Sequence, residues 1–301
     1  MSVRRFVVLD KSFLFGVRKE VISELSERYN FLASESLLGE CFQSFLPGQK
    51  KDERTRHENA AALMKFSHDD SHLFRIPSSG LLVGIEARTR RPCWPIEDYI
   101  GSRIQFNPSY FKSALRMRKE EEPIVESWSA KVAESVQISL DSYITGNLWP
   151  LYEWDDSLKQ FAANPTTPIS DLKKLIRRKL PEFQKRVAED EDFVRSQYCW
   201  MRPLFYPAPE KISSRWLLFR SIQIHLLVHL NLVEKNCANA HAMTLLKTTH
   251  EWLDYQYCLL ASQVGALATG EPSQMARFRQ LCPNGVALFY DSKSQEVMEH
   301  N

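Results

Sequence analysis

The chain lacks closely spaced cysteines, long hydrophobic runs and a large net charge. Its six cysteines form no CxxC pair, so neither a zinc site nor a disulfide framework is indicated, and a reducing cytoplasm fits best. No run approaches the roughly 18 consecutive apolar residues that span a membrane. The N-terminus begins with a strand-like segment and not with a charged-then-apolar signal. We therefore expect a cytoplasmic protein that does not enter a membrane.

The formal net charge of the 301-residue chain is only +2. A charge this small gives no global field for nucleic acid, so binding of RNA or DNA would need a local patch. Hydrophobic residues make up 44% and charged residues 25%, which is ordinary for a soluble globular protein. The length allows one large domain or two smaller ones.

A unit of helix, strand and acid lies near the C-terminus, in THEWLDYQYCLLASQVGALATGEPSQMARFRQ. Apolar residues recur at helical spacing from Trp252, which predicts a helix with Asp254 near its start. Gly265 ends this helix, and the apolar run over 266–269 is typical of a buried strand of a parallel sheet. Glu271 follows directly. In open α/β sheets, sites gather beyond the carboxyl ends of the strands, so Glu271 is placed like a metal ligand.

The N-terminal segment RFVVLDKSFLFG places a second acid after a strand. The apolar run over 6–9 predicts a short strand, Asp10 follows at its carboxyl end, and Ser12 lies two positions further on. An Asp in this place also begins turns and caps helices, so Asp10 alone carries little weight.

A third acid lies on a predicted helix beside the core. The sequence predicts a helix ending about Tyr29, a strand over 31–33, and a further helix that opens at Ser34 or Ser36. On that helix Glu40 faces the same general direction as the apolar Leu37. An acid beside a core face is unusual without a reason.

Asp10, Glu40, Asp254 and Glu271 in these settings resemble the PIN-like nuclease domain. The resemblance covers roughly the first 46 and the last 55 residues, and a strand over 286–290 is similar to the last strand of that family. It implies an α/β fold with a Rossmann-like parallel sheet assembled from both chain ends, 1–46 and 241–301. It also implies three or four acids that bind divalent metal and hydrolyse a phosphodiester. The last acid of the family is usually Asp, and here it is Glu271.

The resemblance assigns the four acids to one site for Mg²⁺ or Mn²⁺. Clustered carboxylates repel one another, and a hard divalent cation, which prefers oxygen ligands, relieves that repulsion. We expect Asp10 and Asp254 to bind the metal directly. Glu40 and Glu271 either bind it or orient the attacking water.

Two hydroxyls are expected to assist the acids. Ser12 and Thr269 either hold the carboxylates through hydrogen bonds or contact phosphate.

Residues 47–240 are predicted to form a mostly helical insertion that shapes a substrate channel or receives a protein regulator. Within it, two β-like runs flank Pro-Ser-Ser-Gly and predict a β-hairpin over 73–93. The hairpin carries a group of positive charges, for which a solvated edge is favoured over a phosphate-binding patch. These charges are Arg75, Arg88, Arg90 and Arg91.

The rest of the insertion reads as helices. One is predicted over 124–144, and a basic one, DLKKLIRRKL, over 171–180, for which a solvated face is favoured over a face that grips a nucleic-acid backbone. A helix over 213–234 is apolar on nearly all sides and should be buried, and another over 238–246 leads back to the C-terminal unit.

Four residues in or near the buried helix are candidate ligands. His225 and His229 have a spacing that can hold a metal, but local hydrogen bonds are favoured because no HExxH glutamate accompanies them. Arg215 and Arg220 are better candidates for contacting a phosphate or one of the acids.

The sequence therefore predicts a metal-dependent PIN-like endonuclease, acting on RNA rather than DNA because that is the commoner activity in the family. Family analogy alone suggests a toxin-like or phage-defence effector. One alternative is a PIN-like interaction or regulatory protein without catalysis, supported by Glu271 and the modest charge. Another is a helical scaffold in which the acids never meet. The positions of the acids distinguish these readings.

Overall fold

The computed structural model describes most of the two chain ends and parts of the middle. The described residues are 4–42, 53–66, 72–104, 123, 126–127, 156, 169–201, 211–236 and 245–301. The predicted helices over 124–144 and 238–246 lie largely outside these residues, as do the side chains of His225 and His229.

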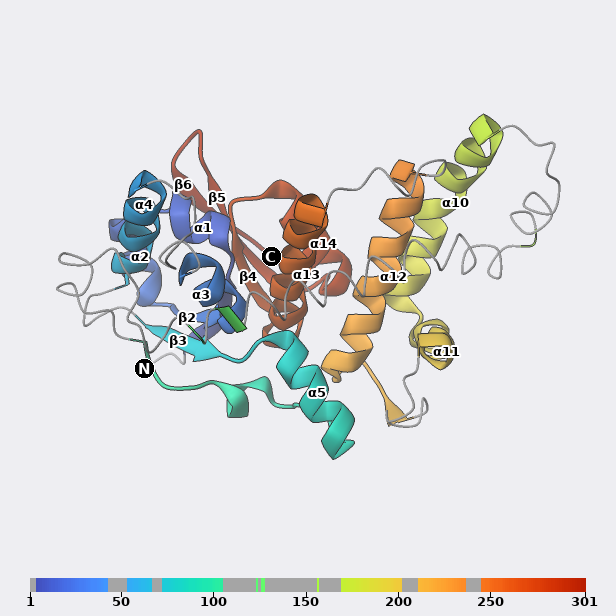
Figure 1. Ribbon diagram of the computed structural model, residues 1–301, viewed down its shortest axis with the longest axis horizontal. Coiled ribbons are helices and arrows are strands. Elements are labelled where there is room, and N and C mark those ends of the chain that lie inside the picture. Colours follow the sequence, from blue (N-terminus) through green and yellow to red (C-terminus); the bar gives the residue numbers. More distant parts are fainter. Residues whose placement is uncertain are drawn as a thin grey trace.

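A single six-stranded sheet is built from both ends of the chain (Figure 1). Its order is β3-β2-β1-β4-β5-β6, and all neighbours are parallel except β5 and β6. The order reverses between β1 and β4, which makes their carboxyl ends the topological switch point. The strands are β1 Arg5–Leu9, β2 Tyr29–Ser34, β3 Leu73–Ile76, β4 Ala266–Thr269, β5 Val286–Asp291 and β6 Glu296–His300.

Helices pack on the sheet and extend to one side of it (Figure 1). In the N-terminal part these are α1 Lys11–Gly16, α2 Lys19–Ser26, α3 Glu35–Phe42, α4 Glu53–Met64, α5 Ser79–Thr89 and the 3-10 turn η2 Ile96–Tyr99. In the remainder they are α10 Ile169–Glu189, α11 Glu191–Met201, α12 Leu217–Asn236, α13 Leu245–Val264 and α14 Pro272–Leu281. Among these, α13 contacts β1 and β4, and α12 joins α10 and α11 to α5 and α13.

The core explains why short apolar runs identified the strands. Val7, Val8 and Leu9 of β1 are fully buried, and every residue of β4 is buried, as expected for parallel strands covered on both faces. The strands predicted over 6–9, 31–33, 266–269 and 286–290 are confirmed. An α/β fold with a mostly parallel sheet is therefore confirmed. Within the described residues, no helix is sufficiently long and apolar to cross a membrane.

The helix that carries Asp254 is longer than predicted. α13 begins at Leu245, so Asp254 lies in the middle of the helix and not near its start. The reason is local: no glycine or proline interrupts the segment between Leu245 and Gly265, and Leu245 with Leu246 continues the helix on its N-terminal side. Gly265 ends the helix as predicted, with φ +81°.

The predicted hairpin over 73–93 is wrong. Its first run is β3, which pairs in parallel with β2, but the second run is α5. Ser78 acts as the N-cap of that helix, and its side chain accepts a hydrogen bond from the Leu81 amide at 3.3 Å. The segment Pro-Ser-Ser-Gly therefore starts a helix and does not close a turn. One strand of the sheet thus lies inside the range predicted for the insertion.

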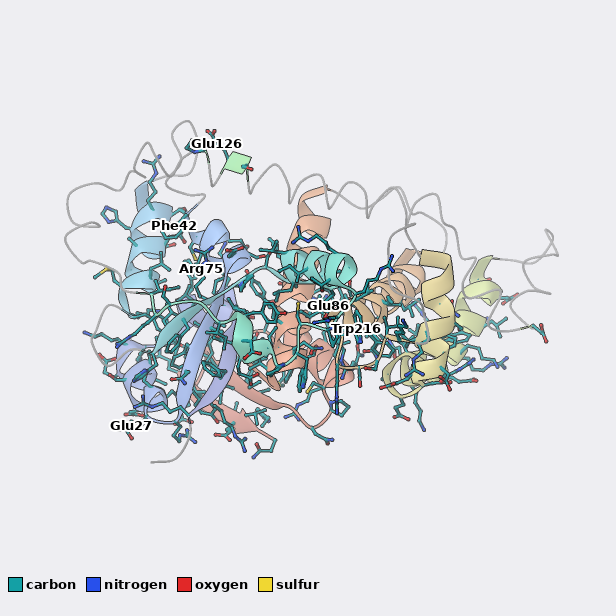
Figure 2. The ribbon with its side chains drawn as sticks, turned by 90° about the horizontal axis from the view of Figure 1, so that it is seen from below. Glu27, Phe42, Arg75, Glu86, Glu126 and Trp216 are labelled. Carbon is teal, nitrogen blue, oxygen red and sulfur yellow. The ribbon has the colours of Figure 1, made fainter. Side chains whose placement is uncertain are left out.

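A buried acid, Glu86, joins α5 to α12. Its carboxylate accepts hydrogen bonds from the Cys93, Leu217 and Leu218 amides at 2.8, 3.0 and 2.8 Å. The side chain is fully buried and lies beside Trp216, where α12 begins (Figure 2). Burial raises the pKa of Glu86, although the three amide donors oppose this. Glu86 thus satisfies amides at the start of a helix 131 residues away.

Lys65, which directly follows α4, binds the C-terminal end of α1. The Lys65 ammonium donates to the carbonyls of Leu14 and Phe15 at 3.0 and 2.8 Å. These are carbonyls of the last turn of α1, where a cation is favourable. Partial burial lowers the pKa of Lys65 to about 8. α1, which follows Asp10, is therefore anchored at both ends.

We expect Glu86→Ala to destabilise the fold by roughly 3 kcal/mol, because three amides lose their acceptor in a buried place. Glu86→Gln should cost less, since one side-chain oxygen remains. Urea unfolding of both variants measures the effect, with Glu24→Ala on an exposed face of α2 as the control. Equal unfolding midpoints for Glu86→Ala and Glu24→Ala would show that these bonds do not secure α12.

Candidate functional site

Asp10 lies where the two ends of the chain meet. Leu9 is in register with Ala268, and the Asp10 amide donates to the Ala268 carbonyl at 3.0 Å. This puts Asp10 at the carboxyl end of β1, beside the carboxyl end of β4. The side chain is only 2% exposed. A buried carboxyl at a topological switch point is a position typical of binding sites in α/β proteins.

Both oxygens of Asp10 accept hydrogen bonds. Oδ1 accepts from the Ser12 hydroxyl at 2.7 Å and from the Phe13 amide at 2.8 Å, and Oδ2 accepts from the Thr269 hydroxyl. Asp10 is thus the N-cap of α1 as well as a candidate site residue. Of the two roles predicted for Ser12 and Thr269, hydrogen bonding to a carboxylate is the one observed.

The turn after β4 is fixed by the same two hydroxyls. Ser12 Oγ accepts from the Gly270 amide at 2.7 Å, and Thr269 Oγ1 accepts from the Glu271 amide at 3.0 Å. A Cβ at Gly270 would lie 3.3 Å from Ser12 Oγ, so this close approach favours glycine. Glu271 then precedes α14, and its side chain is exposed. The last predicted acid therefore lies at the solvent edge of the site.

Asp254 reaches the site from α13 and is paired with an arginine. Its Oδ2 accepts from Arg277 Nη1 on α14 at 3.1 Å, and its backbone carbonyl accepts from the Gln274 amide group at 3.1 Å. The Arg277 guanidinium also lies 4.8 Å from the centre of the Tyr255 ring. The Asp254 side chain is 25% exposed and that of Arg277 16%. This ion pair is therefore partly shielded from water.

Glu40 is buried beside the same helix. Its Oε2 accepts from the hydroxyl of Tyr257, three residues after Asp254 on α13, and its Oε1 lies 3.6 Å from Lys11 Nζ. Burial and the charge of Glu40 hold the pKa of Tyr257 well above its ordinary value. Tyr257 therefore stays protonated at physiological pH and donates a hydrogen bond to Glu40.

The pKa values of Asp10 and Asp254 respond to the charges of other acids of the site. Burial raises the pKa of Asp10 to about 6, against the hydrogen bonds from Thr269, Phe13 and Ser12, with a further contribution from Glu271. Burial also raises the pKa of Asp254 to about 7, and the negative charge of Glu271 is the next largest cause. Arg277 lowers this pKa, whereas Asp10 and Glu40 raise it further. The acids thus lie around one region, which disfavours the reading in which they never meet.

The acids are nevertheless not arranged as a metal cage. Their oxygens are the donors that Mg²⁺ and Mn²⁺ prefer. Across the described ranges, however, no three Asp, Glu, His or Cys side chains are grouped so as to hold an ion. Asp254 is turned to Arg277, Glu40 to Tyr257 and Lys11, and Asp10 to three donors of its own. The oxygen atoms of these acids are therefore ligands of the right type for such a metal, but their positions in this structure do not form a metal site.

Sequence reasoning missed the residues that hold the acids. Arg277, Tyr257, Lys11 and Gln274 were not predicted as part of the site. Tyr257 could have been found, because it lies three residues from Asp254 on one helix and so shares its face. The pairing of Arg277 with Asp254 depends on how α14 packs on α13, which no local pattern reveals.

The other predicted ligands lie elsewhere. Arg215 is exposed, and the partly buried Arg220 donates to Gln223 at 2.9 Å rather than to a site acid. At the carboxyl end of α5, Arg88, Arg90 and Arg91 are exposed, whereas Arg75 forms an ion pair with Glu35.

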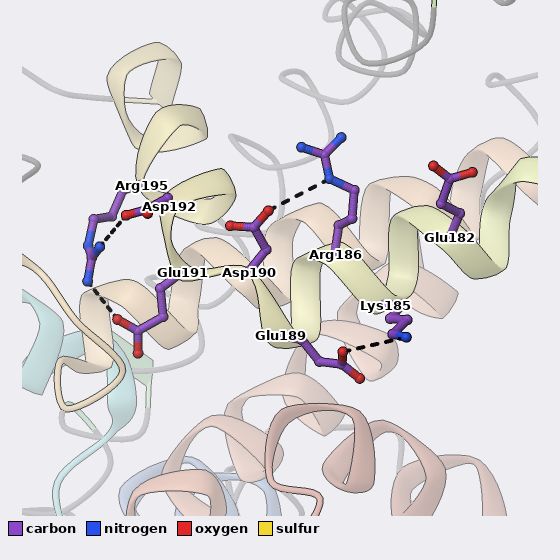
Figure 3. A pocket seen from close by; sticks show the side chains of 8 residues that line it. All are labelled: Glu182, Lys185, Arg186, Glu189, Asp190, Glu191, Asp192 and Arg195. Atoms are coloured by element: carbon purple, nitrogen blue, oxygen red, sulfur yellow. Dashed lines mark hydrogen bonds and ion pairs between the residues drawn. The ribbon is translucent and has the colours of Figure 1, made fainter.

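A charged hollow lies at the junction of α10 and α11 (Figure 3). Its cations are paired: Arg195 with Glu191 and Asp192 at 2.6 Å each, and Arg186 with Asp190 at 3.9 Å. Exposed pairs of this kind contribute little energy. The basic segment over 171–180, for which a solvated face is predicted, lies before this hollow on α10, and its Lys174, Arg177 and Arg178 are exposed. The remaining lining residues are Glu182, Lys185 and Glu189.

We expect the fold to lose stability as pH rises from about 4 to about 7. A carboxyl whose pKa is higher in the folded state than in the unfolded state favours folding when it is protonated. Its contribution to the free energy of unfolding is complete below the pKa of the unfolded state and is lost as pH rises through the pKa of the folded state. For Asp10 and Asp254 that window runs from about pH 4 to about pH 7. The loss should be on the order of a few kcal/mol.

Thermal unfolding at several pH values tests this expectation, with Asp254→Asn beside the wild type. The variant should show a flatter profile near pH 7 because its amide does not ionise. A wild-type stability that climbs from about pH 4 to about pH 7 in parallel with the variant would contradict the assignment.

Comparison of the chain with protein-family models, with curated proteins and with solved structures gave no match. The residues of the site and their geometry are therefore what supports a function.

Proposed function

We propose that the chain is a metal-dependent nuclease of the PIN-like type that hydrolyses phosphodiester bonds, in RNA rather than DNA. One observation carries this proposal. The buried Asp10 carboxylate, at the carboxyl ends of β1 and β4, accepts from the Thr269 hydroxyl, which itself accepts from the Glu271 amide. Glu271, Asp10 and the buried Glu40 also raise the pKa of Asp254. Buried acids without a function are rare, because burial disfavours their charge. Binding of a cation and a phosphate would explain why these acids lie close together despite that cost.

The chain's own residues have clear tasks in such a site. Thr269 and Ser12 hold the Asp10 carboxylate in one orientation, and the same hydroxyls fix the turn that carries Glu271. Such support keeps a ligand in place. Tyr257 and Lys11 hold Glu40. Bound Mg²⁺ or Mn²⁺ would supply charge stabilisation for the phosphate and an activated water.

The first turn after β1 argues against a dinucleotide site at the same switch point. Dinucleotide-binding Rossmann domains have a glycine-rich turn there, which lets the backbone approach the pyrophosphate. This chain has Asp10, Lys11 and Ser12 in that turn, and its first glycine is Gly16 at the end of α1. The turn offers the oxygens of Asp10 and Ser12, which suit a cation, while the Lys11 ammonium lies 3.6 Å from Glu40.

The helices beside the sheet suit a second role. α10, α11 and α12 form a group to one side of the sheet, joined to it through α5 and α13 (Figure 1). We propose that they shape the path of the substrate or receive a protein regulator. A toxin-like or phage-defence setting rests on family analogy alone.

A binding protein without catalysis is the second candidate, and the ion pairs of the site favour it. Arg277 holds Asp254, and Lys11 lies close to Glu40. A site whose acids are already neutralised by the protein needs no metal for stability. Such a protein would bind a partner with the PIN-like surface and cleave nothing.

We expect purified protein to cut labelled single-stranded RNA with Mg²⁺ or Mn²⁺ and to stop in EDTA. Asp10→Asn and Asp254→Asn should each remove most cleavage, because each loses the charge that attracts the cation. Asp98→Asn, at an exposed place on η2, should cut like the wild type. Thr269→Val should slow cleavage by roughly 10- to 100-fold, since it removes the hydrogen bond that holds Asp10 Oδ2.

Single-stranded DNA of the same sequence shows which nucleic acid is preferred. Equal cleavage by wild type and Asp10→Asn would identify a contaminating nuclease and defeat the assignment. Binding without cleavage under every metal condition would support the second candidate.

We expect neutralisation of Arg88, Arg90 and Arg91 to weaken RNA binding, because these exposed charges lie together at the end of α5. If all three contact phosphates, the slope of log K against log salt should flatten by about 2 for a single strand. Titration of fluorescent RNA at several salt concentrations in EDTA measures this slope. An unchanged slope would show that these arginines are solvated and do not contact phosphates.

A further inference from the structure

Arg277 lies among the acids as a fixed positive charge. Its guanidinium donates to Asp254 Oδ2 at 3.1 Å and lies over the Tyr255 ring. Two residues from the same face of α14 thus contact α13 near Asp254, since Gln274 donates to the Asp254 carbonyl. An arginine remains charged at every relevant pH. Contacts with Asp254 and Tyr255 therefore hold this charge against α13.

The charge of Arg277 acts against the accumulation of negative charge at Asp254. Glu271, Asp10 and Glu40 all raise the pKa of Asp254, and Arg277 opposes them. With side-chain exposures of 16% and 25%, the pair is screened less than a surface pair. Arg277 thus does for Asp254 what a bound cation would do.

A divalent cation held by Asp254 would compete with Arg277 for the same carboxylate. Both would need its oxygens, and their positive charges would repel each other. While Asp254 is turned to α14, its oxygens are not grouped with those of the other acids, and the described side chains form no metal cage. This pairing is one cause of the mismatch between donor type and arrangement, beside the contacts that hold Glu40 and Asp10.

We propose that Arg277 is an internal counter-ion that a divalent metal must displace from Asp254, so that it limits the metal affinity of the site. This inference rests on the proposed function, because that function supplies the metal. Arg277 is a positioning residue: it acts through Asp254. Its removal should tighten metal binding, whereas removal of an arginine that builds the site would weaken it.

Calorimetric titration of the full chain with Mn²⁺ tests the proposal without any substrate. Arg277→Gln should bind Mn²⁺ about 3- to 10-fold more tightly than the wild type, the range expected for an ion pair of about 1 kcal/mol. Arg277→Lys keeps the charge and should bind like the wild type. Arg279→Gln is the matched control, because it removes the same charge from α14 at a side chain that donates to Pro283.

Three outcomes are distinguishable. Tighter binding by Arg277→Gln alone supports the proposal. Unchanged or weaker binding by Arg277→Gln, or an equal gain in Arg279→Gln, overturns it while leaving the metal site in place. Absence of Mn²⁺ binding in all four proteins overturns the proposed function together with this inference. If Arg277→Gln melts far below the wild type, Arg277→Met, which retains apolar contact with Tyr255, replaces it with the same expected gain.

Discussion

The parallel pairing of β1 with β4 is the constraint on which the rest of the structure depends. It joins two segments of chain separated by more than 250 residues, with Leu9 in register with Ala268. The pairing creates the point where the strand order reverses, and it brings Asp10 to Thr269. Without this pairing, Asp10 would be only the cap of a short helix. With it, the cap becomes the buried centre of a site that draws on both chain ends.

Burial has a cost, and hydrogen bonds and ion pairs offset it. Asp10, Glu40 and Glu86 are all buried acids, and each accepts hydrogen bonds from groups that lie far away in the sequence. Glu86 shows what an acid does when its only task is structural: it satisfies amides at the start of α12. Asp10 and Asp254 differ, since neighbouring acids raise their pKa values further. That mutual repulsion is what a structural acid avoids and a cation site uses.

The sequence reveals those parts of the fold whose causes are local. Strands buried on both faces appear as short apolar runs, so β1, β4 and β5 could be predicted. Glu40 could be found because an acid beside a core face is unusual. Asp10, which a helix cap also explains, gained weight only from the family resemblance. The run LLVGIEA suits a strand or a helix equally, and Ser78 together with bonds from Glu86 to α12 decides for the helix. β6 was not predicted, because its exposed, charged residues lack the alternation of a half-buried strand. Arg277 depends on helix packing alone.

The proposed function requires Asp10 and Asp254 to belong to one cation site. Crystals soaked in Mn²⁺ and measured near the manganese absorption edge test this most directly, since the anomalous signal locates the ion without any assumption about activity. We expect a peak within bonding distance of Asp10 and Asp254 oxygens, with Arg277 moved away from Asp254. Peaks confined to other parts of the molecule, with the Arg277 ion pair intact, would contradict it.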